Sequence, residues 1–215
     1  MGDILKHFFR SNHSIVIMNY IIHFQKDKHI SSILGDDVHE LTLRKNISIR
    51  LMASIMSQQL STKVAAVIFK RFLDIYSGEE PTSQQVLDTS FDTLRSIGLS
   101  NNKMRYIQNV AVFCIEHNIT DTKLLVMENE EIIDLLVQIK GVGQWTVEML
   151  LMFSLGREDV FALDDLGIQQ SMEKLFGLNS TNKKLLKAKM LELSEPWKPY
   201  RSYACLHLWR WKDDK

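Results

Sequence analysis

Glycine and proline are scarce in this chain, with nine and three copies among 215 residues. An all-β or low-complexity protein needs many such residues for its turns, so their scarcity favours long helices joined by short connections. Hydrophobic residues make up 45% of the chain, an ordinary fraction for a globular protein. No internal repeat is visible. The sequence therefore predicts an all-α protein.

The chain also lacks an excess of charge of either sign and is poor in cysteine. Lysine plus arginine and aspartate plus glutamate number 26 each, so no global field draws the protein toward nucleic acid or an anionic membrane. Any DNA-binding surface must then be local. Cys114 and Cys205 are too few for an iron–sulfur cluster or a structural zinc site, and their apolar neighbours indicate buried thiols. We expect an intracellular setting, in the cytoplasm and nucleoid or in a nucleus.

Long hydrophobic runs are missing as well. The apolar stretch 15–22 is too short to cross a bilayer, is interrupted by Asn19, and lacks the cleavage pattern of a signal peptide. Lys6 departs from the myristoylation pattern that Gly2 begins. We therefore expect no membrane partner.

Amphipathic periodicity predicts helices along the whole chain. Cap residues set several of their ends, with Ser61, Thr82 and Ser90 as helix starts and Gly98 as a helix end. The expected helices begin near Ile4, Ser14, Ser31 and Leu43, and then cover 47–76 in two halves broken at 57–61, 82–87, 90–98, 102–117, a short piece after Asp121, 129–137, 144–155, a segment after Asp164 or Asp165, and 199–211.

A glycine turn, Gly141-Val142-Gly143, joins two of these helices and forms a helix–hairpin–helix unit. Such glycines also occur merely to let helices pack closely, and by itself this pattern is weak support for any function. Here Val142 can fill the core between the helices, while Lys140 and Gln144 offer polar groups to a phosphate. Exposed amides at such a turn can approach a phosphate closely and would position DNA without reading its sequence.

Two adjacent carboxylates, Asp164 and Asp165, precede a helical segment. Aspartate is among the preferred N-cap residues, so capping explains one of them without any catalytic role. Capping does not exclude catalysis, because helix amides stabilise the ionised carboxylate. An ionised group is suited to stabilising a developing positive charge.

Four tryptophans lie in the last third of the chain, and most such aromatics belong to a core. We expect packing roles for Trp197 and Trp211. Trp145 directly follows the hairpin, where an indole could stack on a base extruded from DNA.

Several motifs together resemble one family. They are the hairpin with Trp145-Thr146, the run from Asp159 to Gly167, the segment Ser57-Gln58-Gln59-Leu60-Ser61, and Trp197-Lys-Pro-Tyr-Arg-Ser-Tyr-Ala204. Spread along 43–211 in the order that the family shows, they resemble the helix–hairpin–helix (HhH-GPD) DNA glycosylases, specifically the 3-methyladenine DNA glycosylase II branch.

The resemblance implies two helical subdomains with the active site in the cleft between them. One subdomain would combine 1–44 with 131–215 and carry the hairpin and the catalytic aspartate. The other, 45–130, would carry the loop that wedges into DNA.

The resemblance also implies roles for individual residues. Asp165 would be the catalytic carboxylate, and Gln59 would fill the gap left by a flipped nucleotide. The base pocket would contain Trp145, Trp209 and Asp164, the last being less essential than its neighbour. The remaining implied positions are the phosphate-binding hairpin Lys140, Gly141, Val142, Gly143, Gln144 and Thr146, and the carbonyls of Val137, Ile139 and Val142 around a sodium or potassium ion.

Some residues depart from the family pattern. Lys140 stands where many relatives have proline, which loosens the hairpin but adds a charge near the phosphate. Met149 replaces an aromatic pocket residue of some relatives, which leaves base preference open. Trp145 stands where strand-cleaving relatives place a lysine that attacks the sugar. Some members carry an extra β-rich N-terminal domain, and we expect this chain to be a compact version without it.

We therefore predict a monofunctional DNA glycosylase that flips and hydrolyses alkylated purines out of duplex DNA, leaving an abasic site for base excision repair. We expect it to be monomeric and to need no cofactor beyond the ion at the hairpin. Two alternatives stay open: a non-catalytic helix–hairpin–helix module that only binds DNA, and a glycosylase for uracil, deaminated or mismatched bases. The second needs hydrogen-bonding pocket groups, for which His207 is a candidate but not a decisive one, since we expect His207 to be a packed helix residue.

Overall fold

The computed structural model describes residues 19–35, 41–179 and 181–213, and within these ranges it contains helices and no strand. The predicted all-α class is confirmed. The chain packs as two compact units. Leu41–Arg157 form one, called here the middle unit, and Met1–Glu40 with Glu158–Lys215 form the other, the terminal unit.

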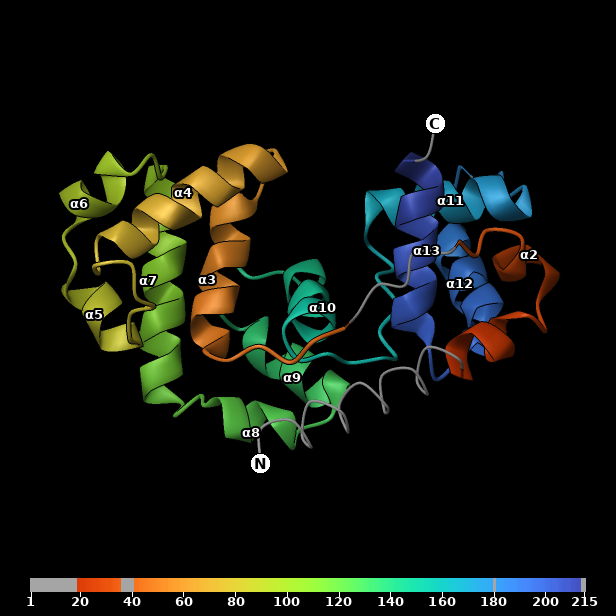
Figure 1. Ribbon diagram of the computed structural model, residues 1–215, viewed down its shortest axis with the longest axis horizontal. Coiled ribbons are helices and arrows are strands. Elements are labelled where there is room, and N and C mark those ends of the chain that lie inside the picture. Colours follow the sequence, from red (N-terminus) through yellow and green to blue (C-terminus); the bar gives the residue numbers. More distant parts are fainter. Residues whose placement is uncertain (1–18, 36–40, 180, 214–215) are drawn as a thin grey trace, which may run out of the picture. The chain divides into compact units, whose positions relative to one another are not determined.

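In the middle unit, α3 is the central helix and packs against α4, α7 and α10 (Figure 1). Its residues Leu51, Met52, Ile55 and Met56 are fully buried. The helices of this unit are α3 (Ile47–Ser57), α4 (Thr62–Asp74), α5 (Ser83–Asp88), α6 (Phe91–Ser96), α7 (Asn101–Glu116), α8 (Asp121–Leu125), α9 (Asn129–Leu136) and α10 (Gln144–Phe153).

The predicted caps are confirmed. The side chains of Ser61, Thr82 and Ser90 each accept an amide of the following first turn. The helix expected near Leu43 begins instead at Ile47. A carboxylate distant in sequence explains this start, because Asp121 accepts the amides of Asn46 at 2.7 Å and Ile47 at 2.9 Å.

The terminal unit is built around its last helix, whose residues from Ser202 to Leu208 are all buried and which packs on α11. Tyr20, in a helical segment that reaches residue 24, stacks on Tyr203 with ring centroids 4.3 Å apart. Trp197 is fully buried and donates to Asp27, as expected of a packing residue. The elements here are α2 (Lys28–Ser31), α11 (Leu166–Phe176), α12 (Lys183–Ser194), η1 (Glu195–Trp197) and α13 (Arg201–Asp213).

Some expectations differ from the structure. The predicted start near Ser31 is in fact the end of α2, and α12 was not predicted at all. The starts near Ile4 and Ser14 lie outside the described residues. The hairpin and α10 group with the middle unit, because α10 packs on α3 and α9. The expected boundary at residue 130 would have placed them in the other unit.

Both cysteines are buried, as expected from their neighbours. Burial raises the pKa of the Cys114 thiol to about 11. Among the described helices, none combines the length and apolar character that a bilayer crossing requires.

Candidate functional site

The glycine turn joins α9 to α10, as predicted. Gly143 is the N-cap of α10, and Val142 between the glycines is only 5% exposed, so it does fill the core below the turn. Lys140, Gly143 and Gln144 are exposed. The hairpin thus presents one cationic side chain and the start of a helix to solvent.

Gly141 is required by the turn itself. Its φ is +105°, and a Cβ built on it would lie 2.2 Å from Cγ of Tyr106 on α7. Asn109, one turn further along α7, donates from Nδ2 to the carbonyl of Lys140 at 3.0 Å. Gly143 differs, since its φ is −98° and a Cβ there would meet no atom within 4 Å.

The start of α10 has the properties of an anion site. The first amides of a helix have no intrahelical acceptor, and the helix dipole places partial positive charge there. Thr146 is not available to an anion in the same way. Its side chain is 3% exposed with Oγ1 3.5 Å from Nε2 of Gln58, and its amide donates to the carbonyl of Gly143.

The carbonyls expected to hold a monovalent ion belong to Val137, Ile139 and Val142. Ile139 O accepts the amide of Val142 at 3.0 Å. A carbonyl oxygen has two lone pairs, so this bond leaves it able to take a cation as well. The ion site stays a prediction.

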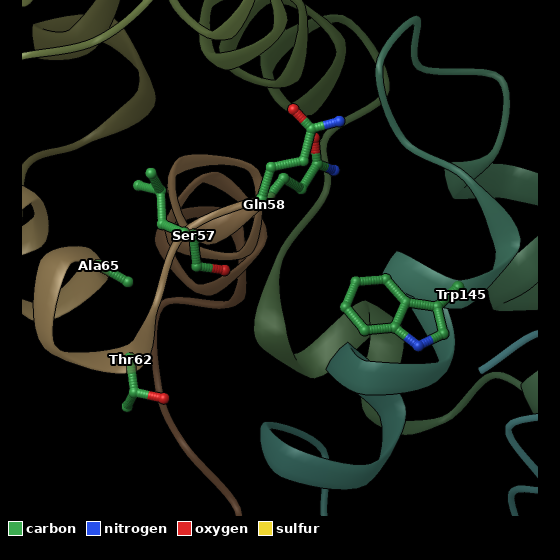
Figure 2. A pocket seen from close by; sticks show the side chains of 7 residues that line it. Ser57, Gln58, Thr62, Ala65 and Trp145 are labelled. Carbon is green, nitrogen blue, oxygen red and sulfur yellow. The ribbon is translucent and has the colours of Figure 1, made fainter. Parts of the chain in front are cut away.

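The half-buried Gln58 and the exposed Gln59 follow the end of α3 and form a turn before α4, called here the Gln59 turn. Gln59 has a φ of +60°, a conformation that residues other than glycine rarely adopt. A pocket of about 640 Å³ opens beside this turn. Figure 2 shows the indole of Trp145 reaching from α10 toward it. The lining residues are Ser57, Gln58, Gln59, Leu60, Thr62, Ala65 and Trp145.

A second pocket of the middle unit, of about 320 Å³, contains Met149 together with Arg44, Arg50 and Ser54. Met149, one of the residues that depart from the family pattern, therefore does line a pocket. Burial, with a smaller contribution from Arg44, lowers the pKa of Arg50, which is paired with Glu80.

Asp165, in the terminal unit, is the N-cap of α11. Its Oδ1 accepts two hydrogen bonds, from the amide of Ile168 at 2.9 Å and from Nε1 of Trp209 at 2.8 Å. The capping prediction is confirmed for Asp165. A Cβ on Gly167 would lie 3.0 Å from this Oδ1 and 3.1 Å from Cδ1 of Trp209, so glycine makes room for the close approach of indole and carboxylate.

Asp164 differs from its neighbour, because it is more exposed and forms an ion pair with Lys187 of α12. Neither this pair nor the Trp209–Asp165 bond was predicted, since both join residues distant in sequence. The only local signal in the sequence for the Trp209–Asp165 bond was Gly167, two residues after Asp165. His207 is 3% exposed, in keeping with a packed residue.

Comparison with known proteins gives a consistent result. A DNA-3-methyladenine glycosylase 1 of Schizosaccharomyces pombe is 39% identical over 162 residues, covering 74% of this chain and 70% of the relative. A putative DNA-3-methyladenine glycosylase of Bacillus subtilis is 30% identical over 217 residues, covering 98% and 73%.

A solved structure of the 3-methyladenine DNA glycosylase of S. pombe in complex with abasic DNA superposes with a TM-score of 0.77 at 34% identity, covering 89% of this chain and 95% of the other. The family model described as "HhH-GPD superfamily base excision DNA repair protein" matches residues 52–199, a span that includes the hairpin, the Gln59 turn and Asp165. This chain therefore belongs to the HhH-GPD superfamily of base excision DNA repair proteins.

Proposed function

We propose that this protein is a monofunctional DNA glycosylase that flips alkylated purines such as 3-methyladenine and 7-methylguanine out of duplex DNA and hydrolyses their glycosidic bonds. The observation that carries the proposal is the doubly hydrogen-bonded Asp165 carboxylate, in a chain whose relatives are named for this activity. The relative solved with abasic DNA holds the type of product that such a reaction leaves. The partner would be double-stranded DNA with damaged bases, met by a monomer inside the cell.

Asp165 is the residue to which we assign the chemistry. Two donors on Oδ1 fix the plane of the carboxylate, and we assign Oδ2 to the sugar. As the glycosidic bond breaks, its electron pair leaves with the base and positive charge develops on the sugar. A fixed carboxylate stabilises that charge and orients the water that attacks C1′, and the water proton passes to the carboxylate or to solvent.

The leaving base needs little help. An alkylated purine such as 3-methyladenine carries a positive charge, which the electron pair of the broken bond neutralises. A cationic base also stacks favourably on an indole face. Trp145, which lines the pocket beside the Gln59 turn, is the indole we assign to this contact.

Duplex DNA hides its glycosidic bonds, so the protein must extrude the nucleotide, at an unstacking cost of roughly a few kcal/mol. Gln59 would occupy the vacated space from its exposed turn. Lys140 and the amides of Gly143 and Gln144 would hold a phosphate of the same duplex, with a monovalent cation on the neighbouring carbonyls completing that contact.

The proposal is tested with a panel of duplexes that carry alkylated, deaminated or mismatched bases. We expect release of the methylated purines and an unbroken abasic strand, because Trp145 offers no amine to attack the sugar. Borohydride should accordingly trap no covalent complex. Release of uracil or of a mismatched base alone would contradict the substrate assignment, and binding without any release would identify a DNA-binding module.

Trp209→Phe tests the support of the carboxylate. It removes the bond to Asp165 Oδ1 and keeps an aromatic ring, and hydrogen bonds to charged groups contribute about 1.5–3 kcal/mol. We expect the single-turnover rate of base release to fall about tenfold, with DNA affinity unchanged. The matched control is Trp211→Phe, since that ring lies against Lys174. Equal rates for the two variants would contradict a role of Trp209 in holding Asp165.

A further inference from the structure

A lysine of α7 holds the backbone of the Gln59 turn. Nζ of Lys103 donates to the carbonyls of Met56 at 2.8 Å and Gln58 at 2.7 Å. These carbonyls lie at the C-terminal end of α3, where a helix leaves its last oxygens without intrahelical donors and where a cation is favoured. The chain leaves the helical conformation at Gln58, with ψ of 131°, and turns to positive φ at Gln59.

Lys103 is oriented toward the protein and not toward solvent at its charged end. Nζ of Lys103 donates to two backbone oxygens of one turn, and partial burial lowers the pKa of its ammonium group. Arg105, two residues further along α7, is exposed. The two cations on one helix therefore have different roles, and only Lys103 is committed to the turn that carries Gln59.

The same helix also holds the glycine hairpin. Tyr106 packs under Gly141, and Asn109 donates to the carbonyl of Lys140. Lys103, Tyr106 and Asn109 are spaced by three residues and so lie along one side of α7. Six residues of helix span about 9 Å, so α7 links the Gln59 turn to the glycine hairpin rigidly over that distance.

We propose that Lys103 is the positioning residue of Gln59, and that α7 holds the Gln59 turn in a fixed place relative to the phosphate-binding hairpin through Lys103, Tyr106 and Asn109. This inference rests on the proposed function, because it takes Gln59 as the residue that enters the duplex. A rarely adopted backbone conformation persists only when its surroundings enforce it. Two hydrogen bonds from one ammonium group to the carbonyls preceding Gln59 provide such enforcement.

The test uses a duplex with a stable abasic-site analogue next to 2-aminopurine, whose fluorescence rises when its neighbours unstack. This readout reports entry of the wedge and needs no hydrolysis. We expect the wild-type protein to produce a rise, Gln59→Ala to lose most of it, and Lys103→Met to lose as much. The dissociation constant for an undamaged duplex should change by less than about twofold in Lys103→Met, because that ammonium is not assigned to a phosphate.

Matched variants separate positioning from charge and from folding. Arg105→Met removes a cation from the same helix and should keep the rise, while Lys103→Arg should restore it. Lys103→Gln, which keeps N–H donors on a shorter side chain but removes the charge, should give an intermediate rise and serves if the methionine variant does not fold. Because Lys103 acts through Gln59, the double variant Lys103→Met with Gln59→Ala should lose no more than Gln59→Ala alone.

A full rise in Lys103→Met, a further loss in the double variant, or an equal loss in Arg105→Met would overturn the proposal, as would the absence of any rise with the wild-type protein. The outcome is separable from the proposed function. A rise that depends on Lys103 in a protein that releases no base would refute the glycosylase activity and leave the positioning role standing.

Discussion

Asp165→Asn is expected to lower the single-turnover rate of 7-methylguanine release by about 10³-fold, within the range found when one electrostatic stabiliser is removed from an active site. The amide has nearly the shape of the carboxylate and can still accept from Ile168 and Trp209 through its oxygen. Only the negative charge that would face the developing sugar cation is lost. The measurement is the rate of base release by protein in excess over DNA, followed by chromatography of the free base.

The control for this change is the same substitution one residue earlier. Asp164→Asn breaks the partly exposed ion pair with Lys187, and such pairs contribute little, so we expect a loss of no more than about threefold. Affinity for DNA that contains an abasic-site analogue should persist in both variants. Undiminished release by Asp165→Asn would refute its catalytic assignment.

Gly141→Ala is expected to have the largest effect on stability, lowering the free energy of unfolding by about 3 kcal/mol. Two causes add. A side chain at positive φ costs roughly 1–2 kcal/mol, and inserting a methyl group into packed surroundings costs typically about 1–3 kcal/mol. The added Cβ would lie 2.2 Å from the ring of Tyr106. Denaturant unfolding measures the loss, and duplex affinity should fall with it because the hairpin is displaced.

Gly143→Ala is the matched control, two residues along the same turn. It has a φ of −98° and space around the added methyl group, so we expect the free energy of unfolding to stay within about 0.5 kcal/mol of the wild-type value. Adding Tyr106→Ala to Gly141→Ala removes the ring contacts at 2.2 Å and 2.6 Å but keeps the Cβ of residue 106 at 2.7 Å, so it should recover only part of the loss that comes from the clash. Equal stability of the two glycine variants would contradict the account of the hairpin.

The helices and their caps could be predicted because their signals are local. Ser61, Thr82 and Ser90 cap as expected, since a cap depends on residues within one turn. The start of α3 could not be placed in the same way, because it is set by Asp121, more than seventy residues away. The lysine-rich α12 has only a weakly amphipathic pattern, and its helical periodicity was missed for that reason.

In the candidate site, too, the features set by local sequence could be predicted, and the contacts between residues distant in sequence could not. That Asp165 caps a helix followed from its place before an amphipathic segment, and the hairpin followed from its glycines. The indole that holds Asp165 and the ammonium that holds the Gln59 turn are contacts across 44 and 45 residues. Such pairs depend on how helices pack, which periodicity does not specify. Gly167 and Lys103 become informative only when their neighbours in space are known.

The most direct test of the central claim is a mass measurement on one reaction. The wild-type protein, in excess, is incubated with a duplex that carries a single 7-methylguanine. Mass spectrometry then identifies the released small molecules and the DNA strands. A protein-free incubation measures the spontaneous loss of the base, which is subtracted. We predict free 7-methylguanine and an equal amount of an unbroken strand with an abasic site. A bound duplex whose methylated base is still attached, or a strand broken at that site, would contradict it.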